Sequence, residues 1–194
     1  MRVDLEIIRR WVKADSRVLD LGCGDGSLMS ILKEDGHACL GIEIDADNIL
    51  ACAAQGLSVI EQDIDKGLPN FADKSFDLVV MTQTLQATHY PHKVLQELLR
   101  VGNEGIVAFP NFANWRSRLH LGLFGHMPVS KFMPYSWYDT PNLHFCTISD
   151  FEDLCHELNI TIVAKVVVEA DGSQGLLTKW FPNLFGATAI YKLR

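Results

Sequence analysis

Residues 18–26 read VLDLGCGDG, an apolar run that ends in three closely spaced glycines. A helical pattern follows at 27–34, with Leu28, Ile31 and Leu32 on one face. A strand, a tight glycine turn and a helix present a nucleotide site at the carboxyl end of the first strand of an α/β domain. We therefore predict an α/β fold with a nucleotide-type ligand at this turn.

The spacing of the glycines separates two classes of ligand. A dinucleotide site follows G-x-G-x-x-G/A, whereas here Gly26 comes one place early and Ser27 stands at the third small position. Asp20 precedes Gly22 by two residues, and a carboxylate there repels a pyrophosphate but suits an ammonium or sulfonium group. The stretch therefore resembles motif I of the class I methyltransferases that depend on S-adenosylmethionine (SAM). The alternative is a plain strand-to-helix turn without a ligand.

Composition limits the class of protein. The chain has 194 residues, 48% of them hydrophobic, which predicts a single domain over 1–194 with an aromatic insertion at about 110–147. A net charge of -7 argues against a nucleic-acid surface. We expect no membrane span and no secretory signal, because no apolar run is long enough. The five scattered cysteines form no C-x-x-C pair, which favours free thiols in the cytoplasm and no metal site.

The resemblance implies a Rossmann-like, doubly wound, mostly parallel sheet of seven strands, with helices on both faces and an antiparallel last strand. The hydrophobic pattern fits this architecture. It predicts strands at 17–21, 39–44, 57–62, 76–81, 105–109, 160–169 and 187–193. It predicts helices at 4–13, 27–34, 45–55, 91–101 and 114–124, and a last helix capped by Ser149. Asp4 is the expected cap of the first helix.

Two acids at strand ends are predicted to hold the ligand. Glu43 ends the second strand, 19 residues after Gly24, where doubly wound nucleotide domains keep a carboxylate for the ribose hydroxyls. The methyltransferase resemblance implies that Asp63 holds the adenine amine. An ordinary surface acid and a loop cap are the respective alternatives. The predicted site for SAM or S-adenosylhomocysteine (SAH) comprises Asp20, Gly22, Cys23, Gly24, Gly26, Glu43, Ile44, Asp63, Ile64 and Thr82.

Two segments are unusually rich in large apolar groups. Residues 110–148 contain Phe112, Trp115, Phe124, Phe132, Tyr135, Trp137, Tyr138 and Phe145, which predicts a lid over the ligand or an interface. The connection 172–186 contains Leu176, Leu177, Trp180, Phe181, Leu184 and Phe185. These groups need burial against the protein's own sheet, a second copy in a homodimer, or a partner.

Over its whole length the chain resembles the MetW family of bacterial methionine-biosynthesis proteins. LDLGCGDG (19–26), GIEID (41–45) and QDID (62–65) are shared with the wider superfamily. FDLVVMTQTLQA (76–87), FPNFANWRSRLHLGLFGHMPVS (109–130) and WYDTPNLHFCTISDF (137–151) are specific to the family. The resemblance implies a SAM-binding, methyltransferase-like protein that associates with a homoserine O-acyltransferase.

Whether the chain is an enzyme stays open at this point. Methyl transfer from a sulfonium can proceed by positioning alone, and it needs a base only when the acceptor loses a proton. The polar candidates near the carboxyl ends of the strands are Gln83, His89, Tyr90, Asn111 and His144. A small-molecule methyltransferase with an unidentified acceptor is therefore the alternative to an accessory subunit of methionine synthesis.

Overall fold

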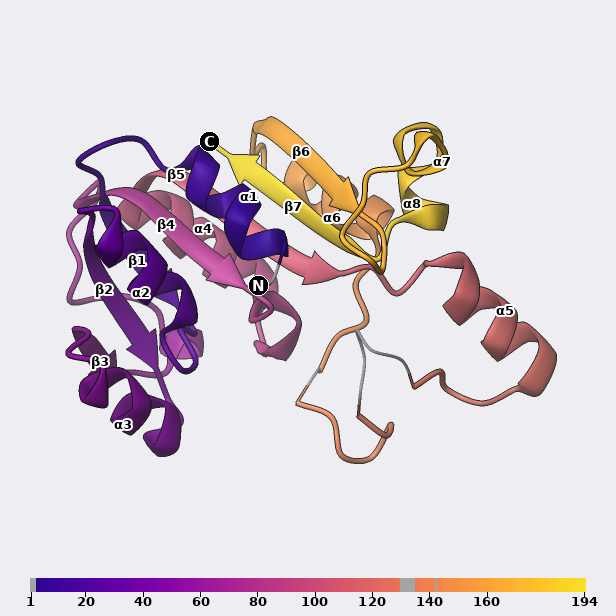
Figure 1. Ribbon diagram of the computed structural model, residues 1–194, viewed down its shortest axis with the longest axis horizontal. Coiled ribbons are helices and arrows are strands. Elements are labelled where there is room, and N and C mark those ends of the chain that lie inside the picture. Colours follow the sequence, from indigo (N-terminus) through magenta and orange to yellow (C-terminus); the bar gives the residue numbers. More distant parts are fainter. Residues whose placement is uncertain (1–2, 130–134, 142) are drawn as a thin grey trace.

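A seven-stranded sheet forms the centre of the computed structural model, which describes residues 3–129, 135–141 and 143–194 (Figure 1). The strand order is β3-β2-β1-β4-β5-β7-β6. The strands are β1 (Arg17–Leu21), β2 (Ala38–Glu43), β3 (Val59–Glu61), β4 (Phe76–Thr82), β5 (Gly102–Pro110), β6 (Ile162–Val168) and β7 (Thr188–Leu193). The first five are parallel, whereas β7 is antiparallel to both β5 and β6. The predicted doubly wound sheet with an antiparallel last strand is confirmed.

Helices cover both faces of this sheet, as predicted. Alternate side chains of each strand point to opposite faces. Val18, Val80 and Ile106 pack in one cluster with α1 (Val3–Trp11) and α2 (Ser27–Glu34). Leu19 and Val79 pack in the other cluster with α4 (Pro91–Val101) and α6 (Ile148–Glu157). A smaller apolar cluster joins the glycine loop and α2 to α3 (Ala46–Ala54).

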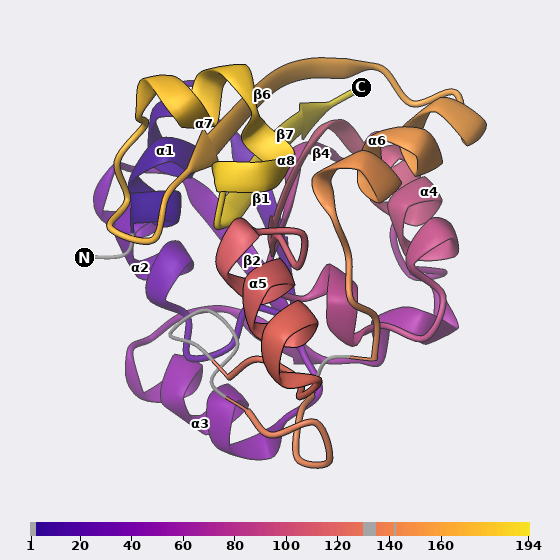
Figure 2. The same cartoon turned by 90° about the vertical axis from the view of Figure 1, so that its right-hand side faces the viewer.

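Three further helices lie together at one end of the molecule, which faces the viewer in Figure 2. They are α5 (Trp115–Phe124), α7 (Leu176–Trp180) and α8 (Pro182–Phe185). The helix predicted at 114–124 is confirmed by α5. The segment 172–186 was expected to be a connection between strands, and it contains α7 and α8 instead. Two short 3₁₀ helices, η1 (Ile64–Lys66) and η2 (Leu85–Ala87), follow β3 and β4.

Several predicted boundaries need correction. The cap of α6 is Thr147 and not Ser149, because Thr147 Oγ1 accepts from Asp150 N while an Asp150 oxygen accepts from Thr147 N. This reciprocal pair satisfies two backbone donors at once. Asp4 lies inside α1, which already includes Val3. β5 begins at Gly102, three residues earlier than expected, and pairs with β4 from that residue onward.

A charge cluster joins distant parts of the chain at the amino end of β5. The Glu104 carboxylate meets Lys13 after α1, Lys192 in β7 and Arg194, at 3.0, 3.0 and 2.8 Å. Burial alone would raise the pKa of Glu104, but the hydrogen bonds from these cations outweigh burial and lower the pKa to about 2. Glu104 therefore stays ionised while it ties α1 and β7 to the middle of the sheet.

Among residues 3–129, 135–141 and 143–194, no helix combines the length and the apolar character that crossing a membrane requires.

Candidate functional site

A cavity of about 420 Å³ lies at the carboxyl ends of β1, β2, β3 and β4. This is the edge at which open α/β sheets bind their ligands, and the volume is in the range of small-molecule sites. Each neighbouring strand end contributes to the wall. The wall residues are Gly22, 42–44, 62–65, 83–84, 87–89 and Pro141. Five of the ten predicted site residues line this cavity, namely Gly22, Glu43, Ile44, Asp63 and Ile64.

Glu43 connects the glycine loop to the end of β2. Its Oε2 accepts from Gly24 N at 2.7 Å, and its Oε1 accepts from Ile44 N and Asp45 N at 2.8 and 3.0 Å. A carboxylate offers about four lone-pair sites, so one site remains, on Oε2. Glu43 therefore positions the loop in addition to facing the cavity. The sequence did not reveal these three backbone contacts.

The glycine loop adopts backbone angles that other residues avoid. Gly24 has φ 55° and Gly26 has φ 81°. A Cβ at Gly26 would lie 2.4 Å from Leu57 Cδ1, whereas a Cβ at Gly24 would meet no atom within 4 Å. Gly26 is thus required by packing, and Gly24 borders open space in which a ligand could approach the backbone.

Cys23 and Asp20 do not reach the cavity wall with their side chains. Cys23 is buried against Met29, Cys52 and Leu57, with its Sγ 4.0 Å from Cys52 Sγ. Its backbone N–H donates to Ile42 O at 3.1 Å and so holds the loop against β2. Asp20 is 1% exposed within β1, and its charge adds to burial in raising the pKa of the Cys23 thiol.

Asp63 faces the cavity as a helix cap. Its Oδ1 accepts from Asp65 N at 3.0 Å at the start of η1, and its Oδ2 lies 3.4 Å from Lys66 Nζ. The loop-cap contact, one of the two alternatives for this acid, is therefore present, and the adenine contact stays a prediction. Ile44 exposes 63% of its surface beside Asp63, although it is a large apolar residue. An exposed isoleucine at a cavity wall offers a flat apolar surface to a ligand ring.

After β4, the chain reaches the wall one residue later than predicted. Gln83 and Thr84 line the cavity, whereas Thr82 is still paired with Ala108 inside the sheet. Thr84 Oγ1 lies 3.0 Å from Thr82 O and 3.3 Å from Gly22 O, so it bridges the ends of β4 and β1. Gln83 has φ 59°, a left-handed conformation that is uncommon for residues with a Cβ.

Of the two histidines among the polar candidates, His89 lines the cavity and His144 does not. His89 Nδ1 lies 3.0 Å from Asp65 Oδ2. Desolvation opposes ionisation of Asp65, but hydrogen bonds from the His89 and Tyr90 backbone and the His89 ring outweigh it and lower the pKa of Asp65. Asp65 thus anchors the chain before α4. Of the other candidates, Asn111 is fully buried, and His144 contributes a backbone N–H to Gln86 O.

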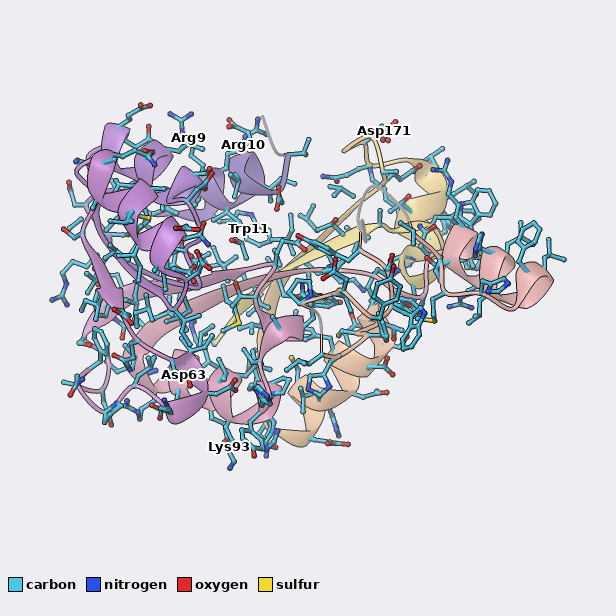
Figure 3. The ribbon with its side chains drawn as sticks, turned by 90° about the horizontal axis from the view of Figure 1, so that it is seen from below. Arg9, Arg10, Trp11, Asp63, Lys93 and Asp171 are labelled. Carbon is cyan, nitrogen blue, oxygen red and sulfur yellow. The ribbon has the colours of Figure 1, made fainter. Side chains whose placement is uncertain are left out.

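A second cavity, of about 390 Å³, lies on the other side of Gln83. Its wall includes Pro110 at the end of β5, Thr188 in β7, Val168 at the end of β6 and the loop 169–172. Gln83 lines both cavities. Figure 3 shows that Asp63, at the first cavity, and Asp171, at the second, come from opposite sides of the molecule. The two cavities therefore flank the carboxyl end of β4.

Part of the aromatic segment reaches the first cavity. Pro141 lines its wall, and the backbone N–H groups of Leu143 and His144 both donate to Gln86 O in η2. By contrast, α5 points away from the sheet (Figure 1). The segment therefore reaches the cavity wall at Pro141, and closure over a ligand stays a prediction. Phe132, one of the aromatic residues assigned to this segment, lies outside the described residues.

The cysteine thiols are buried or partly buried and carry raised pKa values. Desolvation is the main cause, and it raises the pKa of Cys39 and of Cys155 to about 11 and that of Cys146 to about 12. Such groups are almost entirely protonated near neutral pH, and the thiol form is a weak nucleophile. All five are free cysteines in this structure.

The sheet order, the helices on both faces and the cavity at the carboxyl ends define the fold of the class I SAM-dependent methyltransferases. A SAM-dependent methyltransferase from Methanosarcina mazei has this fold, with a TM-score of 0.72, 18% identity, and coverage of 96% of this chain and 95% of that one. The [4+2]-cyclase SpnF also has it, with a TM-score of 0.68, 19% identity, and coverage of 99% and 79%. Proteins named for different reactions thus share the fold.

Within this class, residues 2–193 match the family described as methionine biosynthesis protein MetW, and the chain belongs to that family. A curated relative is 38% identical over 98% of this chain. It is the bifunctional methionine biosynthesis protein MetXA/MetW of Rhodopirellula baltica. The chain spans 32% of the length of that relative.

Proposed function

We propose that this chain binds SAM or SAH in the first cavity and, as a ligand-sensing subunit, acts on a homoserine O-acyltransferase in methionine biosynthesis. The observation that carries the ligand part is the single remaining lone-pair site of Glu43, which faces a cavity bordered by the glycine loop. The partner part rests on the family and on its fused relative.

The residues at the cavity fit a SAM-like ligand. Glu43 Oε2 can accept one ribose hydroxyl while it keeps Gly24 in place. The exposed Ile44 and the neighbouring Ile64 offer apolar surface to the adenine ring, and Asp63 stands beside them for its amine. Gly24 leaves space for the ligand to approach the loop. Bound SAM would supply a methyl group activated on a sulfonium.

The fused relative supports a lasting association between the two activities. Its printed name joins MetXA to MetW in one bifunctional chain, of which the MetW-like part corresponds to this protein. Fusion holds two modules at a high effective concentration. We propose that the separate chain achieves the same association by binding, with the acyltransferase as its partner.

The coupling that we propose is feedback by an end product. SAM is made from methionine, so its level reports the output of the pathway. One segment offers a route for this coupling, since Pro141 lines the cavity while Trp137 and Tyr138 expose 73% and 75% of their surfaces. A ligand that changes the position of 135–141 would change the surface offered to a partner. Such coupling requires different ligand affinities in the free and bound states.

Calorimetry with SAM and SAH tests the ligand part. Glu43→Gln replaces one oxygen by an NH₂ group that cannot accept hydrogen bonds, so we expect affinity to fall by about 1–3 kcal/mol, about tenfold or more. Glu157→Gln, an exposed acid at the end of α6, should bind as the unaltered protein does. Absence of binding heat with both ligands at millimolar concentration would refute a SAM site.

Reconstitution with the acyltransferase of the same organism tests the partner part. We expect the two purified proteins to form a complex, and the rate of acyl transfer to homoserine to depend on added SAM or SAH. The control is the acyltransferase alone with the same ligands. If neither complex formation nor a change of rate occurs under any condition, the partner proposal is wrong.

A small-molecule methyltransferase is the second candidate, and one observation favours it. The second cavity shares Gln83 with the first, so an acceptor placed there would lie next to a ligand in the first cavity. In that case the purified chain should convert SAM to SAH when supplied with a metabolite extract, without the acyltransferase. Gln83→Ala should then slow turnover more than it weakens SAM binding.

A further inference from the structure

Two helices at one end of the molecule expose large apolar side chains. On α5, Leu119, Leu123 and Phe124 are 51–68% exposed, and on α7 and just after it, Leu176, Trp180 and Phe181 are 56–77% exposed. We call these six residues the α5–α7 surface. Both helices lie at the end of the molecule that faces the viewer in Figure 2. Soluble monomers rarely gather so many exposed large apolar side chains at one end unless they bind something.

The helix α5 is built as a projecting element. Ser117 is its only buried residue, although the helix contains Trp115, three leucines and Phe124. Its base is fixed, because Asn114 Nδ2 donates to Phe185 O and Gly186 O at the end of α8. The helix is therefore held in place at one end, next to α8, while its apolar side chains remain in solvent. Burial of these groups would stabilise a complex by about 25 cal/mol per Å² before the costs of association.

The charged residues on α5 and α7 are all basic, whereas two acids, Glu169 and Asp171, lie in the loop before α7. Arg116 and Arg118 lie on α5, and Lys179 lies on α7. Neither helix contains an acidic residue, although the chain has a net charge of -7. A partner that fits this surface therefore combines an apolar patch with a border of carboxylates, because opposite charges steer and align two proteins.

A second copy of the chain fits this surface poorly. A two-fold interface places the same patch of each copy against the other. Each patch would then bring the same three cations, Arg116, Arg118 and Lys179, into one interface, and like charges across an interface are unfavourable. A partner with its own sequence can supply the missing acidic border. Because the fused relative devotes about two thirds of its length to a part outside the match, a large partner is available in the family.

We infer that the α5–α7 surface is the docking site for the homoserine O-acyltransferase, which meets it with an apolar patch bordered by acidic residues. This inference rests on the proposed function for the identity of the partner. Trp180, at 77% exposure, is the expected anchor, because aromatic residues contribute a large share of binding energy at interfaces. The basic residues at the border make association weaker as salt rises.

The test is titration of the purified acyltransferase with surface variants of this chain. Leu123→Glu and Trp180→Glu should each weaken binding by about tenfold or more, and Arg116→Glu should lower the association rate and reduce its salt dependence. Leu50→Glu is the matched control, since Leu50 is a 67% exposed leucine on α3. The Leu50→Glu variant should bind the acyltransferase as tightly as the unaltered chain does. All four variants should keep the SAH affinity of the unaltered chain, which verifies folding.

The outcomes separate this inference from the proposed function. If the unaltered chain binds the acyltransferase but Leu123→Glu and Trp180→Glu bind equally well, the docking site is elsewhere and the proposed function stands. If the unaltered chain does not bind, the proposed partnership fails and the inference with it. A dimer of this chain that Leu123→Glu dissociates without affecting acyltransferase binding would assign the surface to a second copy.

Hydrogen exchange of the complex gives an answer that does not depend on any variant. Peptides covering α5 and α7 should exchange more slowly when the acyltransferase is bound, and peptides covering α3 should exchange unchanged. Unaltered exchange in α5 and α7 within a stable complex would overturn the inference.

Discussion

Gly24 and Gly26 lie in the same loop, but the surroundings of the two positions differ. Both have a positive φ, which costs a residue with a Cβ about 1–2 kcal/mol. Only Gly26 is closely packed, because a Cβ added at this position would collide with Leu57 and Cys52. The two glycines are therefore separable, because Gly26 is required by packing and Gly24 borders open space.

Alanine substitutions separate these roles. Gly26→Ala should lower the free energy of unfolding by about 1–3 kcal/mol more than Gly24→Ala, because it adds a clash in the core to the backbone strain. Gly24→Ala should keep the fold and weaken SAH binding about tenfold, since its methyl group takes up ligand space. Urea denaturation and calorimetry measure the two effects. Equal SAH affinity in Gly24→Ala and the unaltered protein would show that the ligand does not approach this glycine.

At the level of single residues, the spacing after Gly24 selected Glu43 and the family resemblance selected Asp63, and both line the cavity because strand ends meet at one edge of a parallel sheet. The sequence could not show that Glu43 is largely engaged by backbone N–H groups, since these come from Gly24 and from the turn into α3. It also placed Thr82 at the wall, where Gln83 and Thr84 lie. A shift of one residue at the end of a strand changes which side chain faces the cavity.

Among the elements, β5, α6 and α8 are joined by the buried side-chain amide of Asn111, which directly follows β5. Asn111 Nδ2 donates to Asn183 O and Gly186 O at 3.0 and 2.9 Å. Its Oδ1 accepts from Ala113 N at 3.1 Å and from Ile148 N at 3.4 Å. The side chain is thus fully used within the fold, which removes Asn111 from the group of polar residues available for catalysis.

Asn111→Asp should destabilise the protein without a change of volume. The new carboxylate oxygen would face two carbonyl oxygens, so donors are lost and a buried charge is left beside acceptors. We expect a loss of about 2–3 kcal/mol in the free energy of unfolding, measured in urea. Asn103→Asp, at the exposed start of β5, is the matched control. A loss no greater than that of the control would contradict this role of Asn111.

Elements with clear periodicity were predicted well from the sequence. α2, α4 and β1 have the predicted bounds, because each has a distinct apolar face or run and a clear start and end. The helices α7 and α8 were missed, since five and four residues are too few to show a helical period. α5 was found, but its orientation away from the sheet could not be deduced, because its apolar residues occupy all sides.

At the scale of the whole molecule, Glu104 makes stability depend on pH. The folded pKa of about 2 lies below the usual value of 4.5. The contribution of Glu104 is therefore fully present above pH 4.5 and is lost as pH falls toward 2. Two of its three cationic partners are largely exposed, so solvent screening reduces the contribution to about 1–3 kcal/mol.

Glu104→Gln should remove this part of the pH dependence. Between pH 4.5 and 2, the free energy of unfolding should fall less steeply in the variant than in the unaltered protein. At pH 7 the variant should be the less stable of the two. Urea denaturation across this pH range, with Glu157→Gln as the control, measures both effects. Parallel curves for the variant and the unaltered protein would show that Glu104 does not contribute in this way.

The position of β7 between β5 and β6 constrains the order in which the chain can fold. β6 precedes β7 in the chain, but it joins the sheet only through β7. β7 must first find β5, pairing Pro110 with Thr188 and Gly105 with Leu193 across the long stretch 111–187. Closure of such a long loop is slow. Until it closes, the apolar strand IVAKVVV has no partner and can pair with other chains. Pulsed hydrogen exchange during refolding should find β6 protected no earlier than β7. Chaperone binding should be greatest in the interval before β7 pairs with β5.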